Sequence, residues 1–340
     1  MTAFAALLAA ARSGRALSRD EMRAATGLLL DGAVADEDIA AFLLALKARG
    51  ETVEEIVAAA EAVRARALRV SAPDDAIDVC GTGGDGSHTY NISTAVAFIV
   101  AGCGVPVAKH GNRAASSRSG TADVLHALGV DIEAAPETTA RAIREAKVGF
   151  MWASHHHKAF AQVAAVRKKL GVRTIFNALG PLTNPAGARR QLMGVYDRAL
   201  ICSLASALIE LGADRAWVVA GGDGLDELTT TGASFVAEAR GGAVTSFTVT
   251  PEDAGLRRAK AEDLKGADPA ANAGALRALL GGAPGPYRDI AVLNAAAALI
   301  VAGKAASLRD GAGLAARAID DGRASAALGA LVAISNRRPR

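Results

Sequence analysis

A glycine-rich loop is the first segment whose residue types could bind a ligand. Gly81-Thr82-Gly83-Gly84-Asp85-Gly86 places four glycines in six residues, directly after an apolar run with strand character. Without Cβ atoms the backbone can turn sharply, and its N–H groups can approach phosphate oxygens. The loop is neither a P-loop nor a GxGxxG dinucleotide fingerprint. A simple tight turn is the alternative, and Asp85 would repel phosphate unless it binds a hydroxyl, a metal-bound water or a backbone amide.

Two further polar segments could bind anions. Asn91-Ile92-Ser93-Thr94 lies at the start of a predicted helix, where Ser and Thr are ordinary caps and where anions also bind. Lys109-His110-Gly111-Asn112-Arg113-Ala114-Ala115-Ser116-Ser117 follows the next predicted strand. Its two fixed cations, amide and paired hydroxyls favour a phosphate or pyrophosphate site with charge-assisted hydrogen bonds. A solvated basic loop is the alternative.

Two adjacent carboxylates, Asp226 and Glu227, indicate a metal. They lie in Gly222-Asp223-Gly224-Leu225-Asp226-Glu227-Leu228, after the predicted strand Trp217–Ala220. Adjacent carboxylates often only open a helix. Beside phosphate loops they suit Mg²⁺, which takes a few carboxylates together with waters and substrate phosphates. The sequence has no histidine or cysteine cluster of the kind that binds a transition metal.

Three other features are weaker. Of the tract His155-His156-His157 we expect at most one side chain to line a site, because consecutive residues do not share one face. Arg167 could bind a carboxylate or lie on a helix surface. The segment Phe176–Pro185 is rich in Pro and Asn, which predicts a structured loop rather than a helix.

Composition excludes several classes of protein. The chain has 340 residues, a net charge of +3, and lysines and arginines spread along its length, which argues against nucleic-acid binding. Three cysteines without CxxC spacing predict neither a disulfide framework nor a zinc site, and favour the cytoplasm. The apolar runs are too short to span a membrane, and the N-terminus resembles an amphipathic helix more than a signal peptide.

The elements that must position these motifs fall into two predicted regions. Residues 1–72 have helical patterns only, with capping boxes at Ser18/Glu21 and Thr52/Glu55 and an apolar face formed by Ile39, Phe42, Leu43 and Leu46. In residues 73–340, predicted strands alternate with helices, which indicates an α/β domain with a mostly parallel sheet. Ligands collect at the carboxyl ends of such strands. The predicted elements are strands Ile77–Cys80, Val105–Ala108, Gly149–Ala153 and Trp217–Ala220, and helices from Thr94, Ala122–Leu128, Glu137–Lys147, Leu200–Leu211 and from Ile290 onward.

Together these strings resemble the anthranilate phosphoribosyltransferases, a family with the nucleoside-phosphorylase-like fold. The combination of GTGGDG, KHGNR and GPLTNP is highly specific, and the resemblance extends from about residue 18 to residue 300. It implies a small helical domain, to which about 165–190 contribute, and a larger α/β domain. It also implies a homodimer formed through the helical domain, and an active site in the cleft between the domains.

The resemblance implies transfer of the phosphoribosyl group of phosphoribosyl pyrophosphate (PRPP) to the amine of anthranilate, with Mg²⁺ as cofactor, in tryptophan biosynthesis. Anthranilate would contact Gly81, Asn112 and Arg167, and Mg²⁺ would be held by Ser93, Asp226 and Glu227. The residues implied for PRPP are Gly81, Gly84, Asp85, Thr89, Asn91, Ile92, Ser93, Thr94, Lys109, His110, Gly111, Asn112, Arg113, Ala114, Ala115, Ser116, Ser117 and Thr121.

At four positions the chain departs from the family's common pattern. Thr121 replaces a serine but keeps its hydroxyl, and Ala220 stands where histidine is frequent. Ser154 and Lys158 stand where proline is frequent. These changes affect the shape of the anthranilate channel rather than the reaction.

The implied reaction needs no general base, because an aromatic amine is neutral at pH 7. Catalysis would come from positioning and electrostatics, with Lys109 stabilising the charge that builds on pyrophosphate, and with closure of the domains excluding water. Two alternatives stay open. A pyrimidine nucleoside phosphorylase of the same fold would not need the acidic pair, and a non-catalytic nucleic-acid-binding paralogue would be expected to lose that pair or the glycine loop.

Overall fold

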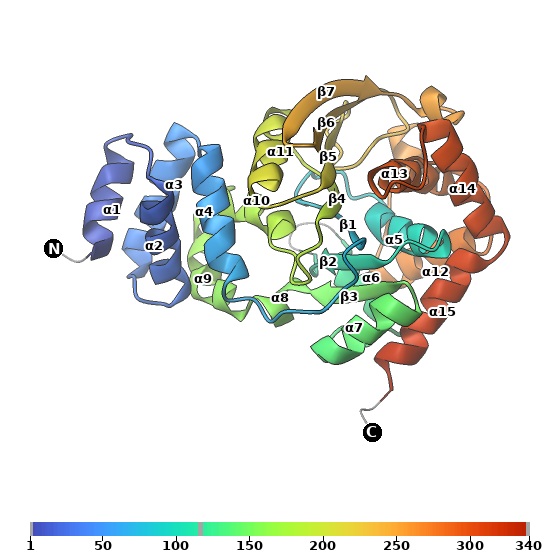
Figure 1. Cartoon of the computed structure of the whole chain (residues 1–340), viewed down its shortest axis with the longest axis horizontal. Coiled ribbons are helices and arrows are strands. Elements are labelled where there is room, and N and C mark those ends of the chain that lie inside the picture. Colours follow the sequence, from blue (N-terminus) through green and yellow to red (C-terminus); the bar gives the residue numbers. More distant parts are fainter. Residues whose placement is uncertain (1–2, 115–117, 338–340) are drawn as a thin grey trace.

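Four helices form the N-terminal region of the computed structural model, which describes residues 3–114 and 118–337. They are α1 (Ala3–Arg12), α2 (Arg19–Leu30), α3 (Asp36–Arg49) and α4 (Val53–Arg64), grouped at one end of the molecule (Figure 1). Both predicted capping boxes are present, at the first residues of α2 and α4. The predicted apolar face of α3 is fully buried, which confirms that these helices pack around a common core.

Two later helices join this region. The α9 helix (Ala161–Leu170) packs on α3, and α10 (Ile175–Leu182) packs on α4. The prediction of a loop over Phe176–Pro185 was therefore wrong for most of the segment. Asn177 accepts a hydrogen bond from the backbone N–H of Thr174 and so caps the start of α10, while Pro181 falls in its last turn. Burial of the apolar residues of α10 outweighs the poor helix propensity of Pro and Asn.

A seven-stranded sheet forms the centre of the larger region. Its order is β3-β2-β1-β4-β5-β6-β7. The first five strands in this order pair in parallel, whereas β6 pairs antiparallel with both β5 and β7. This confirms the predicted small helical domain with an α/β domain around a mostly parallel sheet. The strands are β1 (Ile77–Gly81), β2 (Val107–Gly111), β3 (Val148–Trp152), β4 (Arg190–Gly194), β5 (Arg215–Gly221), β6 (Ser234–Arg240) and β7 (Ala243–Val249).

Predicted strands and helices lie within a few residues of the observed ones. The β2 strand begins two residues later than predicted, because Pro106 has no N–H for the ladder. The helices of this region are α5 (Ile92–Gly102), α6 (Thr121–Ala127), α7 (Pro136–Glu145), α8 (Ala153–His156), α11 (Ile201–Glu210), α12 (Pro269–Leu280), α13 (Pro286–Val301), α14 (Leu308–Asp320) and α15 (Arg323–Ser335). Short 3₁₀ turns are η1 (Lys158–Phe160), η2 (Arg198–Leu200), η3 (Pro251–Ala254) and η4 (Ala261–Leu264).

Helices cover both faces of the sheet. Alternate strand residues such as Val79 and Val219 face one core, in which α5 packs against α13, α14 and α15. Their neighbours, such as Met193 and Val218, face a second core shared with α11 and the N-terminal helices. The α5 helix is thus enclosed by protein, and only its first turn lies at the carboxyl edge of the sheet, next to the end of β1 (Figure 1).

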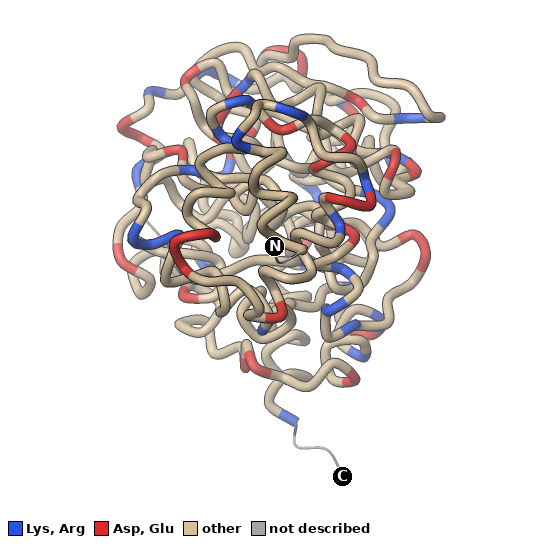
Figure 2. The backbone as a smooth tube through the Cα atoms, turned by 90° about the vertical axis from the view of Figure 1, so that its left-hand side faces the viewer, with Lys and Arg blue, Asp and Glu red and all other residues tan. Residues whose placement is uncertain are grey.

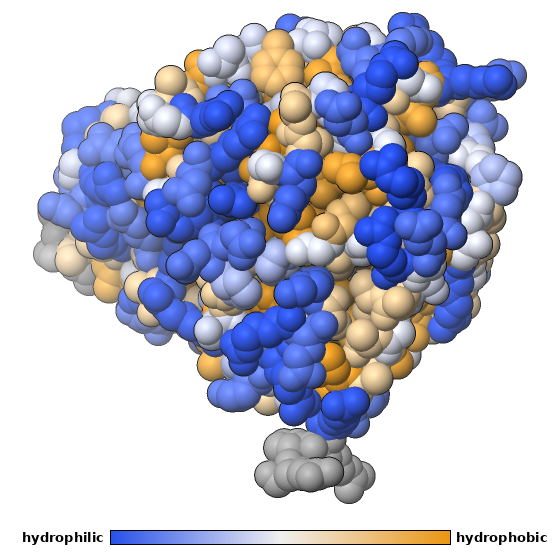
Figure 3. Space-filling model, turned by 45° about the vertical axis from the view of Figure 1, so that its right-hand side comes forward, coloured by the Kyte–Doolittle hydropathy of each residue, from blue (hydrophilic) through white to orange (hydrophobic). Residues whose placement is uncertain are grey.

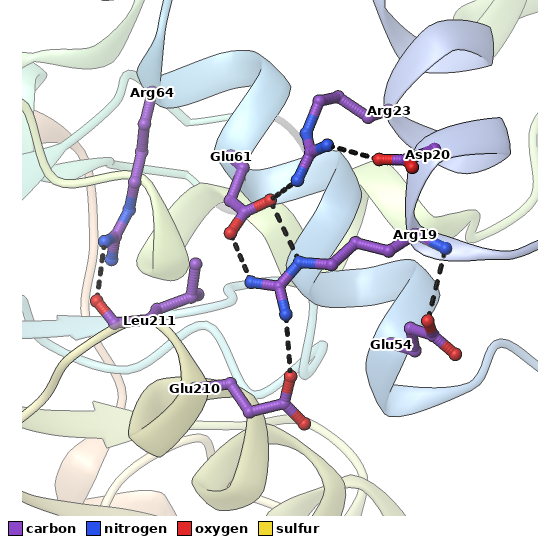
Figure 4. Close-up of polar contacts among 8 residues, drawn as sticks. All are labelled: Arg19, Asp20, Arg23, Glu54, Glu61, Arg64, Glu210 and Leu211. Carbon is purple, nitrogen blue, oxygen red and sulfur yellow. Dashed lines mark hydrogen bonds and ion pairs between the residues drawn. The ribbon is translucent and has the colours of Figure 1, made fainter.

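The N-terminal region is fastened to the sheet region through α4 and α11. Glu61 accepts hydrogen bonds from Arg19 and Arg23, and Arg19 also reaches Glu210 on α11 (Figure 4). Arg64 donates to the carbonyl of Leu211 at the end of α11 (3.1 Å) and to a carbonyl of α10. The pair α4 and α11 is therefore one of the main connections between the two regions.

Charge is mixed over the surface. Lysine and arginine positions alternate with acidic ones on the face formed by the N-terminal helices (Figure 2). On the face shown in Figure 3, polar residues predominate and apolar ones form smaller areas between them. Among the described residues, no helix is long and apolar enough to cross a membrane.

The N-terminal region offers a test of a buried charge. Glu55 is fully buried and accepts hydrogen bonds from the backbone N–H groups of Leu17 and Thr52 and from the guanidinium of Arg49. We expect Glu55→Ala to cost about 3–5 kcal/mol of unfolding free energy, because it leaves the half-buried guanidinium of Arg49 and two N–H groups without partners. Urea unfolding followed by circular dichroism measures the loss.

The matched control for this change is Glu21→Ala. Glu21 holds the same capping-box position in α2 but is not buried, and it pairs with the exposed Arg15. We expect a much smaller loss, because water replaces the contacts of an exposed ion pair. Equal losses in the two variants would contradict the interpretation that burial of Glu55 makes its contacts important.

Candidate active site

The segment Gly222–Leu228, which carries Asp226 and Glu227 and is called the acidic loop below, crosses the carboxyl ends of two adjacent strands. The β1 and β4 strands are neighbours, and the chain order along the sheet reverses between them, the position where open α/β sheets bind ligands. Both strands end in glycine. A Cβ atom on Gly81 would overlap the carboxylate of Asp226, and one on Gly194 would overlap the Asp226 carbonyl. Because these residues lack side chains, the backbone of Asp226 can lie directly on the sheet edge.

The glycine loop is fastened to this edge at several points. The N–H of Gly83 donates to Asp226 Oδ2 (2.7 Å), and the N–H of Thr82 donates to the carbonyl of Gly194 (2.9 Å). Arg173, which follows α9, donates to the carbonyl of Gly84. Three of the loop's four glycines have φ between 66° and 74°, which other residues rarely adopt. The loop is therefore a built structure and not a simple turn.

Asp85 takes one of the roles expected for a carboxylate in a phosphate loop. Its Oδ1 accepts a hydrogen bond from the backbone N–H of Ser87 (3.0 Å). Beyond it, Thr89 forms an isolated bridge with Lys265, whose ammonium donates to the carbonyl of Ser87 (2.6 Å). The segment around Lys265 thus supports the far end of the glycine loop, a contact that no sequence pattern predicts.

The hydroxyls of Ser93 and Thr94, in the first turn of α5, bond to other residues and do not cap the helix. Asn91 precedes the helix and makes no side-chain cap, so Ser93 and Thr94 lie inside the first turn. Lys109, only 2% exposed, donates to Ser93 Oγ (3.1 Å) and to the carbonyl of Val79 (2.6 Å). The Thr94 hydroxyl meets that of Thr121 (3.3 Å). The capping alternative is therefore wrong for both hydroxyls.

In the acidic pair Glu227 is buried and Asp226 is half-buried, and the charge of the two carboxylates is poorly compensated. Burial and the nearby Asp85 raise the pKa of Asp226 to about 7. Burial and the adjacent Asp226 raise the pKa of Glu227, an effect that Lys109 opposes. Burial in turn lowers the pKa of Lys109, although carboxylates surround it. This pattern describes a site with more negative charge than its own cation neutralises, which favours binding of a further cation.

The acidic loop is held by polar residues on both sides of the pair. Asp223 Oδ2 accepts from the hydroxyls of Thr229 and Thr231 (both 2.7 Å), and no helix begins here. On the other side, Asn294 accepts from the N–H of Leu228 (2.9 Å) and donates to its carbonyl (2.8 Å). Asn294 is fully buried in α13. Sequence reasoning missed it, although a single amide in an Ala-rich helix is a usable signal.

A buried carboxylate joins three of the sequence motifs. Asp78 on β1 accepts from the backbone N–H of His110 (3.1 Å) and from the amide of Asn184 (2.7 Å). The same amide donates to the carbonyl of Ala108 on β2 (2.8 Å). The GPLTNP segment therefore contributes to the site indirectly. Its Asn184 links the end of α10 to the two strands that carry the glycine loop and the basic loop (residues 109–117).

The basic loop differs in detail from the expectation. Arg113 pairs with Asp123 (3.0 Å), and the N–H of Ala114 donates to the same carboxylate (2.9 Å), so this cation is partly neutralised. Residues 115–117, which include the expected ligands Ala115, Ser116 and Ser117, lie outside the described residues. Asn91, at the start of α5, supports the chain after this loop by donating a hydrogen bond to the carbonyl of Ser119 (3.1 Å).

Arg167 lies at the end of a row of aromatic rings. His110 packs edge-on against His157 (5.2 Å between centroids), which contacts Phe160, which in turn contacts Phe176. The guanidinium of Arg167 lies 5.3 Å from the Phe176 ring. Among the described residues no carboxylate pairs with Arg167, and burial lowers its pKa. An unpaired, half-buried guanidinium next to flat rings is suited to an aromatic carboxylate.

The histidine tract is divided between two surroundings. His156 and His157 are buried while His155 is half-buried, and His156 Nδ1 contacts the carbonyl of Leu68 (2.7 Å). Burial lowers the pKa of His157 to about 4, so its ring is neutral at pH 7. Of the three, only His157 contacts His110 and the aromatic row.

The close approach at the sheet edge generates a test by substitution. We expect Gly194→Ala to cost about 1–3 kcal/mol of stability, because the backbone of Asp226 must move to admit a methyl group. Gly232→Ala is the matched control, since a Cβ there meets no atom within 4 Å. Its effect should stay within about 0.5 kcal/mol. Thermal unfolding of both variants measures the difference, and similar losses would contradict the proposed packing.

Comparison with known proteins gives one answer over the whole chain. Residues 73–325 match the glycosyl transferase family, a/b domain, and residues 5–67 match its helical bundle domain. The chain is 58% identical to the anthranilate phosphoribosyltransferase of Parvibaculum lavamentivorans, over 99% of this chain and 98% of the relative. The crystal structure of the Thermus thermophilus enzyme superposes with a TM-score of 0.93 at 44% identity, covering 97% of this chain and 99% of that one.

A more distant relative carries ligands. The Saccharomyces cerevisiae anthranilate phosphoribosyltransferase, determined in complex with PRPP and Mg, has a TM-score of 0.89 at 27% identity, over 97% of this chain and 98% of that one. The same yeast enzyme has been determined with 4-fluoroanthranilate. Full-length identity above one half, the matched domains and the shared fold lead to one conclusion: this chain belongs to the anthranilate phosphoribosyltransferase family.

Proposed function

We propose that this protein transfers the 5-phosphoribosyl group of PRPP to the amine of anthranilate, releasing pyrophosphate, with Mg²⁺ as cofactor. The observation that carries the proposal is the convergence at one sheet edge of the glycine loop, the first turn of α5 and the acidic pair, with Arg167 unpaired at the end of an aromatic row. Phosphate, cation and aromatic acid each have a matching surface there.

The donor set fits Mg²⁺ bound together with a substrate. Asp226 and Glu227 supply two carboxylates whose pKa values are raised by burial, so a cation at this position is electrostatically favoured. Ser93 Oγ lies next to the ammonium of Lys109 on the α5 side. Among the described residues, no group of three or more His, Cys, Asp or Glu side chains could hold a metal ion, and Mg²⁺ characteristically completes its coordination with waters and substrate phosphates. When bound, the ion stabilises negative charge on the pyrophosphate.

The protein's own groups position PRPP from two sides. Backbone N–H groups of the glycine loop and of the first turn of α5 present donors and a positive dipole end to phosphate oxygens. We assign PRPP contacts to the described residues Gly81, Gly84, Asp85, Thr89, Asn91 to Thr94, Lys109 to Ala114 and Thr121. The ammonium of Lys109 is bonded to the carbonyl of Val79 and the hydroxyl of Ser93, and from this position it contributes positive electrostatic potential to the phosphate site.

Anthranilate would lie between Asn112, Gly81 and Arg167. Arg167 holds the carboxylate and so orients the amine toward the anomeric carbon. The neutral amine forms the new C–N bond from the face opposite the departing pyrophosphate, whose C–O bond breaks, and the surplus proton leaves to water or pyrophosphate. Neutral His157 contributes an uncharged wall beside the ring, consistent with a reaction that needs no general base.

The proposal is tested by the loss of anthranilate fluorescence. Wild-type protein with PRPP and Mg²⁺ should consume anthranilate, and EDTA should abolish the change. The Asp226→Ala/Glu227→Ala variant should lose at least about a hundredfold in rate, because the electrostatic stabilisation of the leaving group is removed. Thermal unfolding of the variant verifies that it is folded.

Other outcomes identify the alternatives. Consumption that survives in the double variant would retain the reaction and place the ion elsewhere. If anthranilate is untouched while PRPP is intact, the proposal fails, and phosphorolysis of pyrimidine nucleosides is measured next. Salt-sensitive binding of DNA without turnover would favour the non-catalytic nucleic-acid-binding alternative.

Asn294 provides a second test, because it holds the backbone next to Glu227. We expect Asn294→Leu to raise the Mg²⁺ concentration for half-maximal rate by about 10–100-fold, as loss of supporting contacts around metal ligands does. Leu fills a similar volume but leaves both backbone groups of Leu228 unpaired. Rates measured over a Mg²⁺ titration at saturating PRPP give the shift.

The control for Asn294 must lower stability without touching the acidic loop. Leu299 is fully buried on the same helix, so Leu299→Ala should lower the melting temperature while the Mg²⁺ dependence stays that of the wild type. An Asn294→Leu variant with wild-type Mg²⁺ dependence would show that the amide supports the fold only.

A further inference from the structure

The side-chain amide of Asn112 is fixed by three hydrogen-bond donors on one atom. Its Oδ1 accepts from the indole Nε1 of Trp152 (2.9 Å), from the hydroxyl of Ser154 (3.2 Å) and from the backbone N–H of Arg113 (2.9 Å). The indole and the backbone N–H can only donate, so the atom they meet must be the amide oxygen. These partners therefore determine which way the Asn112 amide faces.

The strands bring these residues together. Gly111, the last residue of β2, is paired in register with Trp152, the last residue of β3, so Asn112 and Ser154 leave adjacent strand ends. The Trp152 ring is itself positioned by the guanidinium of Arg113, 5.2 Å from its centroid. Arg113 in turn is held by Asp123 (3.0 Å). The indole N–H is thus presented to Asn112 by a ring with its own support.

We propose that Trp152 and Ser154 are positioning residues that lock Asn112 with its NH₂ group directed toward the substrates. With the oxygen saturated by three donors, only the two N–H groups of the amide are left for a ligand, and no other contact of Asn112 Nδ2 is present among the described residues. Asn112 then offers a donor to an acceptor oxygen of the bound substrate and disfavours a donor at that position. The inference rests on the proposed function for the identity of that substrate.

The geometry is tested without turnover by NMR. Trp152 and Trp217 are the only tryptophans, so the indole region of a ¹⁵N–¹H spectrum holds two side-chain resonances, and Trp217→Phe assigns them. Asn112→Ala should shift the Trp152 indole resonance and leave that of Trp217 in place. An unmoved Trp152 resonance would overturn the proposed hydrogen bond, whatever reaction the protein catalyses.

The function of the lock is tested by a kinetic cycle. Trp152→Phe keeps the ring but removes the donor, and Ser154→Ala changes an exposed residue, so both should fold. Each should lower kcat/KM for anthranilate by about three- to tenfold, the effect of one neutral hydrogen bond. In an Asn112→Ala background each should change kcat/KM by less than about twofold, because both act through Asn112. A full effect in that background would overturn the proposal.

Two further variants separate the lock from general damage. Trp217→Phe removes an indole donor of the same kind, bound to Glu238 (3.1 Å) far along the sheet, and should leave kcat/KM unchanged. Asn112→Asp can accept the same three bonds but cannot donate, so retained activity in that variant would overturn the assignment of the NH₂ group. If wild-type protein shows no turnover, the proposed function fails, and the NMR result still decides the geometry.

Discussion

The contact between Asp226 and two strand-ending glycines is the constraint on which the site depends. Gly81 and Gly194 end neighbouring parallel strands, and a side chain on either would occupy the place of Asp226. The absence of these side chains lets the acidic loop lie across the sheet edge and accept the N–H of Gly83. One steric condition thus brings together the glycine loop and a pair of carboxylates that are about 140 residues apart in the sequence.

The rest of the site is built by buried polar residues that tie separate segments to this edge. Asp78 links β1 to the basic loop and to Asn184, while Asn294 fixes the backbone beside Glu227 from α13. Each of these groups is fully buried or nearly so, and its hydrogen bonds reach other elements. Such contacts do not tolerate small displacements, because an unpaired polar group in the interior is costly. The reactive groups are therefore held by a network and not by local chain stiffness alone.

The sequence predicted the elements well where local rules determine structure. Both capping boxes and the apolar face of α3 were readable because propensity and pattern agree there. The α10 helix was missed because burial in the helical region overrode Pro and Asn, which no local rule reveals. Of the site, the strings that could bind phosphate and metal were recognisable, and the expected loops converge at one sheet edge. The supporting contacts of Lys265, Asn294 and Trp152 join distant segments, so their partners are visible only in the fold, although the lone amide of Asn294 in an Ala-rich helix is itself recognisable.

The electrostatics of the site argue that it is completed by its ligands. Buried carboxylates with raised pKa values lower the stability of the free protein, since the charged form is poorly solvated. Lys109 offsets only part of this charge, and its ammonium is already bound by Val79 and Ser93. A cation arriving with an anionic substrate neutralises the pair and is itself neutralised by the phosphates. Under the proposed function, metal and substrate bind with positive coupling, because each supplies the charge that the other lacks. The unfavourable charge is thus located where the ligands of the proposed function would neutralise it.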